Sequence, residues 1–107
     1  MEEIVDVDIT GPDAAWLAEF TRRLVDDRLV ACGNVSPGLR SIYRWDGAVQ
    51  DEPEARVALH TRRSLVPEIV ERTAELHPYD VPGFRFRPVR ASPAYQQWVI
   101  ESTTPEA

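Results

Sequence analysis

The dipeptide Asp46-Gly47 restricts the fold of this chain more than any other feature of its sequence. It separates an extended stretch ending at Trp45 from a second extended stretch over residues 55–61. A two-residue type I′ turn needs positive φ at both central positions, which Asp-Gly tolerates better than most pairs. The sequence therefore predicts a long β-hairpin that reverses here. Pro37-Gly38 interrupts the first strand of this hairpin and predicts a kink within it.

The returning strand of the hairpin shows a strict alternation. A period of two predicts one face in the core and one face turned away from it. His60 belongs to the face turned away, and Pro53 predicts that the early part of the strand lies at a sheet edge or bulge, because proline cannot donate to a strand ladder. The positions predicted to face the core are Ala55, Val57, Leu59 and Thr61.

Two helices and two more strands are expected around this hairpin. Alternating apolar residues predict a first strand over residues 5–10, and Gly11-Pro12-Asp13 predicts a helix with proline at its first position. A second helix is expected from near Ser64, ending before His77-Pro78, because proline disfavours helical geometry in the preceding residue. Residues 84–89 alternate again and predict a last main strand.

The C-terminal part of the chain adds one short element. Ser92-Pro93 resembles a cap followed by proline at the first helical position, so a final helix is expected there. Residues 103–107 show no apolar periodicity and are expected to form a frayed end. The order strand, helix, strand, strand, helix, strand and terminal helix predicts an α+β fold of the ferredoxin-like βαββαβ type.

Length and charge narrow the functional classes. With 107 residues, the chain is expected to form one domain over residues 1–107. Its 18 acidic and 12 basic residues give a formal net charge of −6, which makes nucleic acid a poor partner. All twelve basic residues are arginine, so chemistry that requires a lysine amine is excluded.

Cysteine usage and the N-terminal sequence bear on location. One cysteine, Cys32, cannot form an internal disulfide, which favours a reducing compartment. The first residues lack the basic and long apolar regions of a targeting or membrane segment. We therefore expect a cytoplasmic protein without a membrane partner.

Five short motifs follow one another over nearly the whole chain. They are RLVACGNV at residues 28–35, PGLRSIYRWDG at residues 37–47, LHTR at residues 59–62, LHPYDVP at residues 76–82 and SPAYQQW at residues 92–98. This ordered set resembles the CutA family, named for divalent cation tolerance. His60 stands where that family usually has a lysine, and residues 83–87 replace a more aliphatic run.

The resemblance implies both an assembly and a role. It implies a homotrimer in which the long hairpins pair with neighbouring subunits and clefts form between protomers. It also implies a part in copper or divalent-metal tolerance, without an established reaction or an organic cofactor. The family's architecture is similar to that of PII signalling proteins, which bind small effectors in intersubunit clefts.

Three residues have the strongest affinity for transition metals. Thiolates suit copper(I), and imidazoles suit borderline ions, so we consider Cys32, His60 and His77. Their spacing contains no local metal signature, so a site needs tertiary convergence or several protomers, with acids such as Glu54 or Asp80. Cys32 and His77 are the predicted metal ligands. The alternatives are that Cys32 is a small buried residue and that His77 closes a helix end.

The residues predicted to line the ligand cleft share a position in the hairpin or the motifs beside it. An anionic effector bound by Arg40, His60 and Arg62 is the competing hypothesis to metal binding. Solvated arginines and aromatic residues packed at subunit contacts are the simpler alternatives. Because no catalytic motif occurs, we expect no enzyme, although a small enzyme that uses His60 is a third possibility. The full predicted set is Arg40, Tyr43, Trp45, His60, Thr61, Arg62 and Tyr79.

Overall fold

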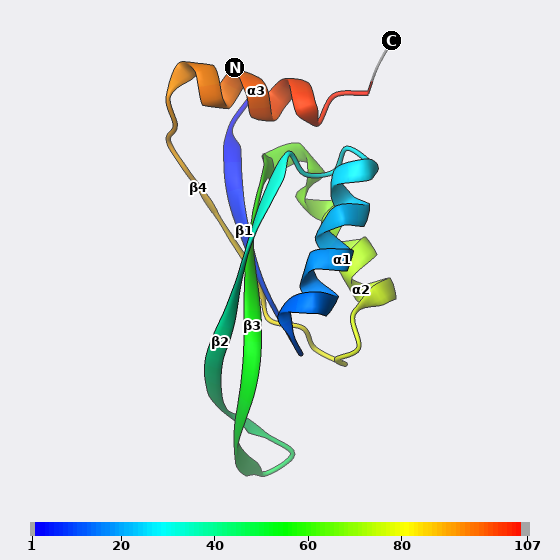
Figure 1. Ribbon diagram of the computed structural model, residues 1–107, viewed down its shortest axis with the longest axis vertical. Helices are drawn as coiled ribbons and strands as arrows, with labels where there is room; N and C mark the ends of the chain where they lie inside the picture. Colours follow the sequence, from blue (N-terminus) through cyan, green and yellow to red (C-terminus); the bar gives the residue numbers. More distant parts are fainter. Residues whose placement is uncertain (1, 106–107) are drawn as a thin grey trace.

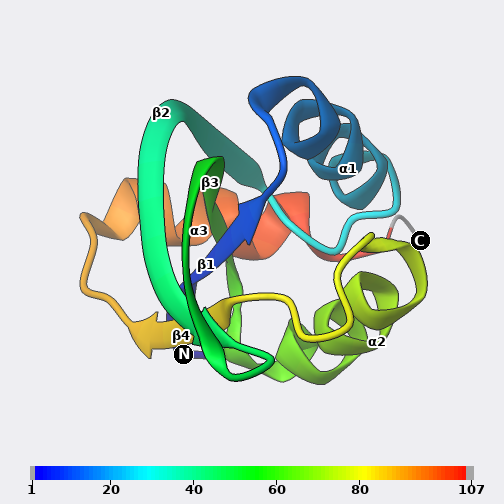
Figure 2. The ribbon, with the colours of Figure 1, turned by 90° about the horizontal axis from the view of Figure 1, so that it is seen from below.

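The computed structural model describes residues 2–105 and contains one antiparallel sheet of four strands in the order β2-β3-β1-β4. Helices α1 and α2 lie together on one side of this sheet, and α3 crosses one end of it (Figures 1 and 2). This arrangement confirms the predicted α+β βαββαβ fold. The elements are β1 (Ile4–Gly11), α1 (Ala14–Asp26), β2 (Cys32–Trp45), β3 (Ala48–Arg62), a 3₁₀ turn (Arg63–Leu65), α2 (Val66–Leu76), β4 (Phe84–Pro88) and α3 (Pro93–Ser102).

The core lies between the sheet and the two helices. Alternate residues of β1 and β3 point towards α1 and α2, and Val7 and Leu59 face each other across the two strands with no exposed surface. Helix α1 contributes one apolar stripe, which includes Leu17 and Leu24. The alternation read from the sequence is confirmed, including the four buried positions predicted in β3.

Both core helices begin later than the sequence suggested. Asp13 is the residue that caps α1, because its carboxylate accepts a hydrogen bond of 2.7 Å from the Trp16 amide, and Pro12 therefore lies before the helix. Helix α2 begins at Val66, since a 3₁₀ turn occupies the expected first residues. Its end at Leu76, with His77 as the closing residue, agrees with the prediction.

The β2–β3 hairpin projects beyond the helices as an arm, formed by residues 39–54 (Figure 1). Asp46 and Gly47 have φ angles of 52° and 77°, and Trp45 pairs directly with Ala48, so the predicted two-residue turn is confirmed. The chain measures 48 Å along its longest axis. Its radius of gyration of 14.6 Å exceeds the roughly 13 Å expected for a compact chain of this length.

An irregularity at Pro37-Gly38 changes which side chains share a face of the arm. Before it, Ser36 pairs with Arg56, and after it Leu39 pairs with Glu54, so β2 contains one extra residue. Gly38 has a φ of 81°, which favours glycine. Because of the extra residue, the odd-numbered Tyr43 and Trp45 lie on the same sheet face as the even-numbered Cys32.

The C-terminal segment corrects the expectation of a frayed end. Thr103 is buried, and its hydroxyl donates to the Val99 carbonyl at 2.8 Å. The Arg62 guanidinium donates to the Thr103 hydroxyl at 2.9 Å and to its carbonyl at 2.8 Å. This pair joins α3 to the end of β3. Residues 106 and 107 of the predicted frayed end lie outside the described residues.

Candidate functional site

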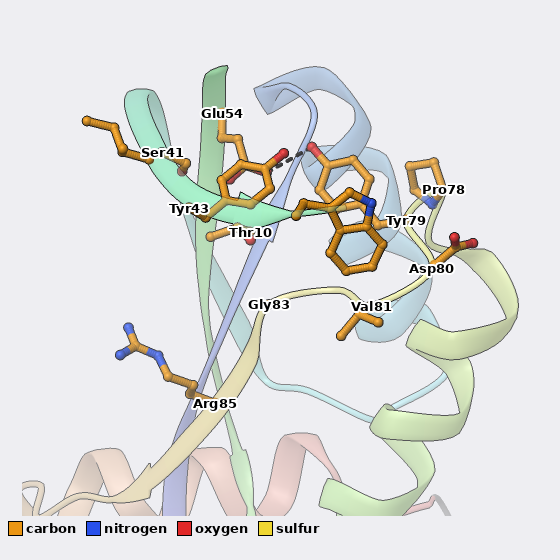
Figure 3. A pocket seen from close by; sticks show the side chains of 12 residues that line it. Thr10, Ser41, Tyr43, Glu54, Pro78, Tyr79, Asp80, Val81, Gly83 and Arg85 are labelled. Atoms are coloured by element: carbon orange, nitrogen blue, oxygen red, sulfur yellow. Dashed lines mark hydrogen bonds between the residues drawn. The ribbon is translucent and has the colours of Figure 1, made fainter. Parts of the chain in front are cut away.

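A cleft of about 780 Å³ lies between the arm and the loop that connects α2 to β4. Figure 3 shows Tyr43 of β2, Glu54 of β3 and Tyr79 of this loop gathered at one end of the cleft, with the hydrogen bond between Tyr79 and Glu54 dashed. Three elements that are distant in sequence therefore meet here. The lining residues are Thr10, Ser41, Ile42, Tyr43, Trp45, Glu54, Pro78, Tyr79, Asp80, Val81, Gly83 and Arg85.

Two tyrosine–glutamate pairs dominate the chemistry of the cleft. The Tyr79 hydroxyl donates to Glu54 Oε2 at 2.8 Å, and the Tyr43 hydroxyl donates to Glu52 Oε1 at 3.2 Å. Burial and then the bonded carboxylate Glu54 raise the pKa of Tyr79 well above its usual range. Burial and the charge of Glu52 likewise raise the pKa of Tyr43. Both phenols therefore stay neutral, and the negative charge of the cleft resides on its carboxylates.

His77 holds the loop in place beneath the cleft. Its Nε2 lies 2.7 Å from the Thr10 carbonyl oxygen, and its Nδ1 accepts a bond of 3.1 Å from the Tyr79 amide. A carbonyl can only accept, so Nε2 carries the proton. The ring also packs against Trp16, with centroids 4.8 Å apart, and is almost fully buried. A metal-ligand role for His77 would require it to give up one of these two bonds.

Cys32 and His60 lie together elsewhere, on the sheet face opposite α1 and α2, which we call the open face. Cys32, His60 and Asp6 form a cross-strand row over β2, β3 and β1. His60 Nδ1 lies 2.6 Å from the Tyr95 hydroxyl of α3. Burial raises the pKa of Tyr95, and the neighbouring Cys32 raises it further. The structure therefore joins Cys32 to His60 and Tyr95.

The two predicted metal ligands are not brought together within one chain. His77 bonds to Thr10, which lies four residues along β1 from Asp6, the strand neighbour of His60. Four residues of strand span roughly 13 Å. Within residues 2–105, no group of three or more His, Cys, Asp or Glu side chains is arranged to hold a metal ion.

The other predicted cleft residues have partners outside the cleft. Arg40 forms a two-bond ion pair with Asp51, at 2.8 and 2.7 Å. Arg62 binds Glu2 and Thr103, and the buried Thr61 hydroxyl donates to the Leu29 carbonyl at 2.6 Å. Of the seven predicted cleft residues, Tyr43, Trp45 and Tyr79 line this cleft, whereas Arg40, His60, Thr61 and Arg62 do not.

Sequence reasoning missed two contributors to these sites. Glu52 was not considered, although it faces Ser41 across the hairpin and shares the face of Tyr43. Once the turn at Asp46-Gly47 is fixed, counting outwards from it gives this pairing. Tyr95 is one of the aromatic residues for which packing at subunit contacts was the simpler alternative, and no pattern in the sequence indicates that it reaches His60 from another element.

Comparison with known proteins finds relatives of similar length in bacteria and archaea, whereas the chain spans about half the length of the mouse, human and Arabidopsis relatives it matches. The family model described as CutA1 divalent ion tolerance protein matches residues 5–102. The divalent-cation tolerance protein CutA of Thermus thermophilus is 36% identical over 104 residues, covering 96% of this chain and 99% of that protein. That of Pyrococcus horikoshii is 37% identical over 95 residues, covering 88% and 92%.

Solved structures agree with the sequence comparison. The divalent cation tolerance protein structure from Thermus thermophilus superposes with a TM-score of 0.88 at 38% identity, covering 97% of this chain and all of that one. CutA1 from Oryza sativa gives a TM-score of 0.91 at 29% identity, covering 98% and 97%. Divalent-cation tolerance is the role for which the family is named. The chain belongs to the CutA1 divalent ion tolerance family.

Proposed function

We propose that this protein acts in the cytoplasm as a homotrimeric metal-response protein rather than as an enzyme. It would bind copper or another divalent metal ion weakly, near the boundaries between protomers, without an organic cofactor. Family membership supports the role in divalent-cation tolerance. The observation that carries the proposal further is the pairing of Cys32 with His60 on the open face.

Two features of the arm and sheet support association with further copies. Ile42 and Val49 are 65% and 64% exposed, although apolar side chains in an arm gain nothing from contact with water. The sheet order leaves β2 and β4 as edge strands, and β2 is 14 residues long. Long edges pair readily with other strands, and pairing between copies would satisfy both edges.

The ligand set favours a weak site that more than one protomer completes. A thiolate and an imidazole suit copper and zinc, and Cys32 and His60 are neighbours across two strands. Two ligands from one chain are fewer than the four of a structural zinc site. An open face that packs against another copy would supply the missing ligands.

The assembly is tested by light scattering. We expect a mass near 36 kDa, three times the 12.1 kDa of the chain, at micromolar concentration. Variants Ile42→Ser and Val49→Ser should lower this mass, because they remove apolar surface from the arm. A stable species of 12.1 kDa in the unaltered protein would contradict the proposed trimer.

Metal binding is tested by calorimetric titration with Zn²⁺, and with Cu⁺ under anaerobic conditions. We expect Cys32→Ser and His60→Gln each to weaken binding by about tenfold or more, since even the loss of a partner that only orients a ligand costs that much. His77→Gln is the matched control, because both nitrogens of His77 already have partners within the chain. Equal affinity in the unaltered protein, Cys32→Ser and His60→Gln would contradict the assigned ligands.

A further inference from the structure

We propose that the cleft between the arm and the loop over residues 77–83 binds a small organic cation of the alkylammonium class, held by the rings of Tyr43, Trp45 and Tyr79 and the carboxylate of Glu54. This site differs from the Cys32–His60 pair in its location, residues and ligand chemistry. It extends the proposed function and does not depend on it.

The charge of the cleft selects for a cation. Its lining contains two carboxylates, Glu54 and Asp80, and one guanidinium, Arg85. Arg85 lies well apart from Tyr43 and Tyr79 (Figure 3), so the aromatic end of the cleft is acidic. Glu52, bonded to Tyr43, adds a further negative charge beside it. These carboxylates would repel an anionic ligand, and Arg85 lies too far from this end of the cleft to offset the repulsion.

Part of this negative charge is available to a ligand. Glu54 binds Tyr79 through Oε2, and its Oε1 has no hydrogen-bond partner within residues 2–105. The carboxylate of Asp80 forms no ion pair or hydrogen bond with any described side chain. A bound ammonium group could therefore approach Glu54 Oε1 without breaking an existing contact, and Asp80 adds a second negative charge to the lining.

The aromatic rings supply the second element of recognition. In the single chain, Tyr43 and Trp45 are 40% and 47% exposed, so part of each ring faces the cleft rather than the core. The face of an aromatic ring carries negative charge and attracts ammonium groups, with tryptophan the strongest of the three ring types. Tyr79 is held firmly, because its amide binds His77 and its hydroxyl binds Glu54. The rings of a preformed site lose little freedom when a ligand binds.

Size and donor chemistry distinguish an organic cation from a metal ion. The volume of about 780 Å³ is typical of small-molecule sites, which span roughly 300–1,000 Å³. Much of the lining is ring and aliphatic carbon, which offers a bare ion no ligand atoms. Within residues 2–105, no cluster of three acidic, histidine or cysteine side chains converges to hold a metal. A ligand with alkyl groups around its charge matches both parts of the lining.

The test compares a cation with its neutral shape analogue by NMR titration. Choline is the probe, and 3,3-dimethyl-1-butanol, in which carbon replaces the charged nitrogen, is the control. We expect saturable shifts of the Trp45 indole Nε1–H signal with choline, while the indole signals of Trp16 and Trp98 stay in place. Equal shifts with the neutral alcohol, or none with choline up to 50 mM (a limit on the order of the weakest useful affinities), would overturn the proposal.

Matched variants locate the binding. Trp45→Leu and Glu54→Gln should each weaken choline binding about 3- to 30-fold, the range expected for a lost ring or charge contact. For Trp45→Leu, binding is followed through the amide signals of Val81 and Gly83. Trp98→Leu and Glu101→Gln, exposed positions on α3, should leave the affinity unchanged.

Two further results separate this proposal from loss of folding and from metal binding. Glu54→Gln keeps an oxygen acceptor for Tyr79, so its thermal unfolding should match that of the unaltered protein. Cys32→Ser should bind choline normally, even if it loses metal. If Trp45→Leu and Glu54→Gln bind choline as tightly as the Trp98→Leu control, the cleft is not the site and the proposal fails.

Discussion

The two halves of β3 belong to one continuous strand but differ in the burial of their side chains. Over residues 55–61, every second side chain is buried at 0–1% exposure against the helices, and the strand is bordered by β1 and β2. Over residues 48–54, the strand pairs with β2 and lies beyond the end of β1, and most of its side chains are exposed. The inner half is fixed by burial, whereas the arm half is fixed by hairpin pairing and a turn.

This difference indicates what each half contributes. A residue in the inner half stabilises the single folded chain, because it removes apolar surface from water. A residue in the arm contributes little to stability through burial in the core, so the apolar and aromatic side chains of the arm need another explanation. The proposed trimer accounts for Ile42 and Val49, and the proposed cation site accounts for Tyr43 and Trp45 on the other face of the arm.

The strongest test of the comparison is truncation of one apolar residue in each half. Leu59→Ala should lower the free energy of unfolding by about 2–5 kcal/mol, because it leaves a cavity beneath the helices. Val49→Ala should change it by less than about 0.5 kcal/mol in the dissociated chain, since Val49 is 64% exposed. Urea unfolding monitored by circular dichroism measures both values.

Protein concentration provides the control for this pair. Any larger effect of Val49→Ala should grow with protein concentration, because the residue would act through association between copies. The effect of Leu59→Ala should be present at every concentration. Similar losses for both variants, independent of concentration, would show that the arm is as much a part of the monomer core as the inner half.

Two glycines of β2 extend the comparison to backbone and packing. A Cβ on Gly33 would overlap the Thr21 methyl carbon and lie 3.2 Å from Leu59 Cδ2, so Gly33→Ala should cost about 1–3 kcal/mol through overpacking. A Cβ on Gly38 would meet nothing within 4 Å, but its φ of 81° is unfavourable for alanine. Gly38→Ala should therefore cost about 1 kcal/mol through the backbone alone. Thermal unfolding measures both.

A second change distinguishes the two mechanisms. Thr21→Ser removes the methyl group that the new Cβ of Gly33→Ala would meet, so the double variant should recover part of the lost stability. The same Thr21→Ser change should not affect the cost of Gly38→Ala. Identical behaviour of the two glycine variants in this background would refute the packing explanation for Gly33.

The fold could be predicted because its signals are local. The positive φ at Asp46 and Gly47 and the alternation in β3 each depend on residues close in sequence. Which residues form the candidate sites depends on the sheet face that each side chain occupies and on contacts between segments that are distant in sequence. The extra residue at Pro37-Gly38 determines which face of the sheet Tyr43 occupies. The sequence predicted a kink there, but it did not predict that the kink would move the later side chains to the other face.

Side-chain partners were the least predictable part of the candidate sites. The competing hypothesis had Arg40 and Arg62 bind an anion, but each has a carboxylate partner. Asp51 lies across the hairpin from Arg40, whereas Glu2 is 60 residues from Arg62 and no local pattern connects the two. His77 was considered both as a ligand and as a residue closing a helix. Its two bonds, to Thr10 and Tyr79, depend on how the loop returns to β1, which the sequence does not reveal.

The smallest expected effect concerns these two arginine–carboxylate pairs, one in each region. At the inner end of β3, Arg62 Nη1 donates to Glu2 Oε2 at 3.0 Å, with side chains 18% and 30% exposed. In the arm, Arg40 binds Asp51 with side chains 75% and 43% exposed. Hydrogen bonding from Ser64 and then from Arg62 lowers the pKa of Glu2 below 4.5, and Arg40 lowers that of Asp51 below 3.8.

A lowered carboxyl pKa sets the sign of the pH dependence. The stabilisation from Glu2 is complete above its unfolded pKa of 4.5 and is lost as the pH falls through the lower folded value. At pH 7, Glu2→Gln should lower the free energy of unfolding by at most about 1 kcal/mol, and this difference should disappear in acid. Asp51→Asn should make no measurable difference at either pH, because water surrounds the arm pair. Urea unfolding at pH 7 and pH 3 measures both variants, and a pH-dependent loss in Asp51→Asn that matches the loss in Glu2→Gln would show that solvent exposure does not separate the two halves of β3.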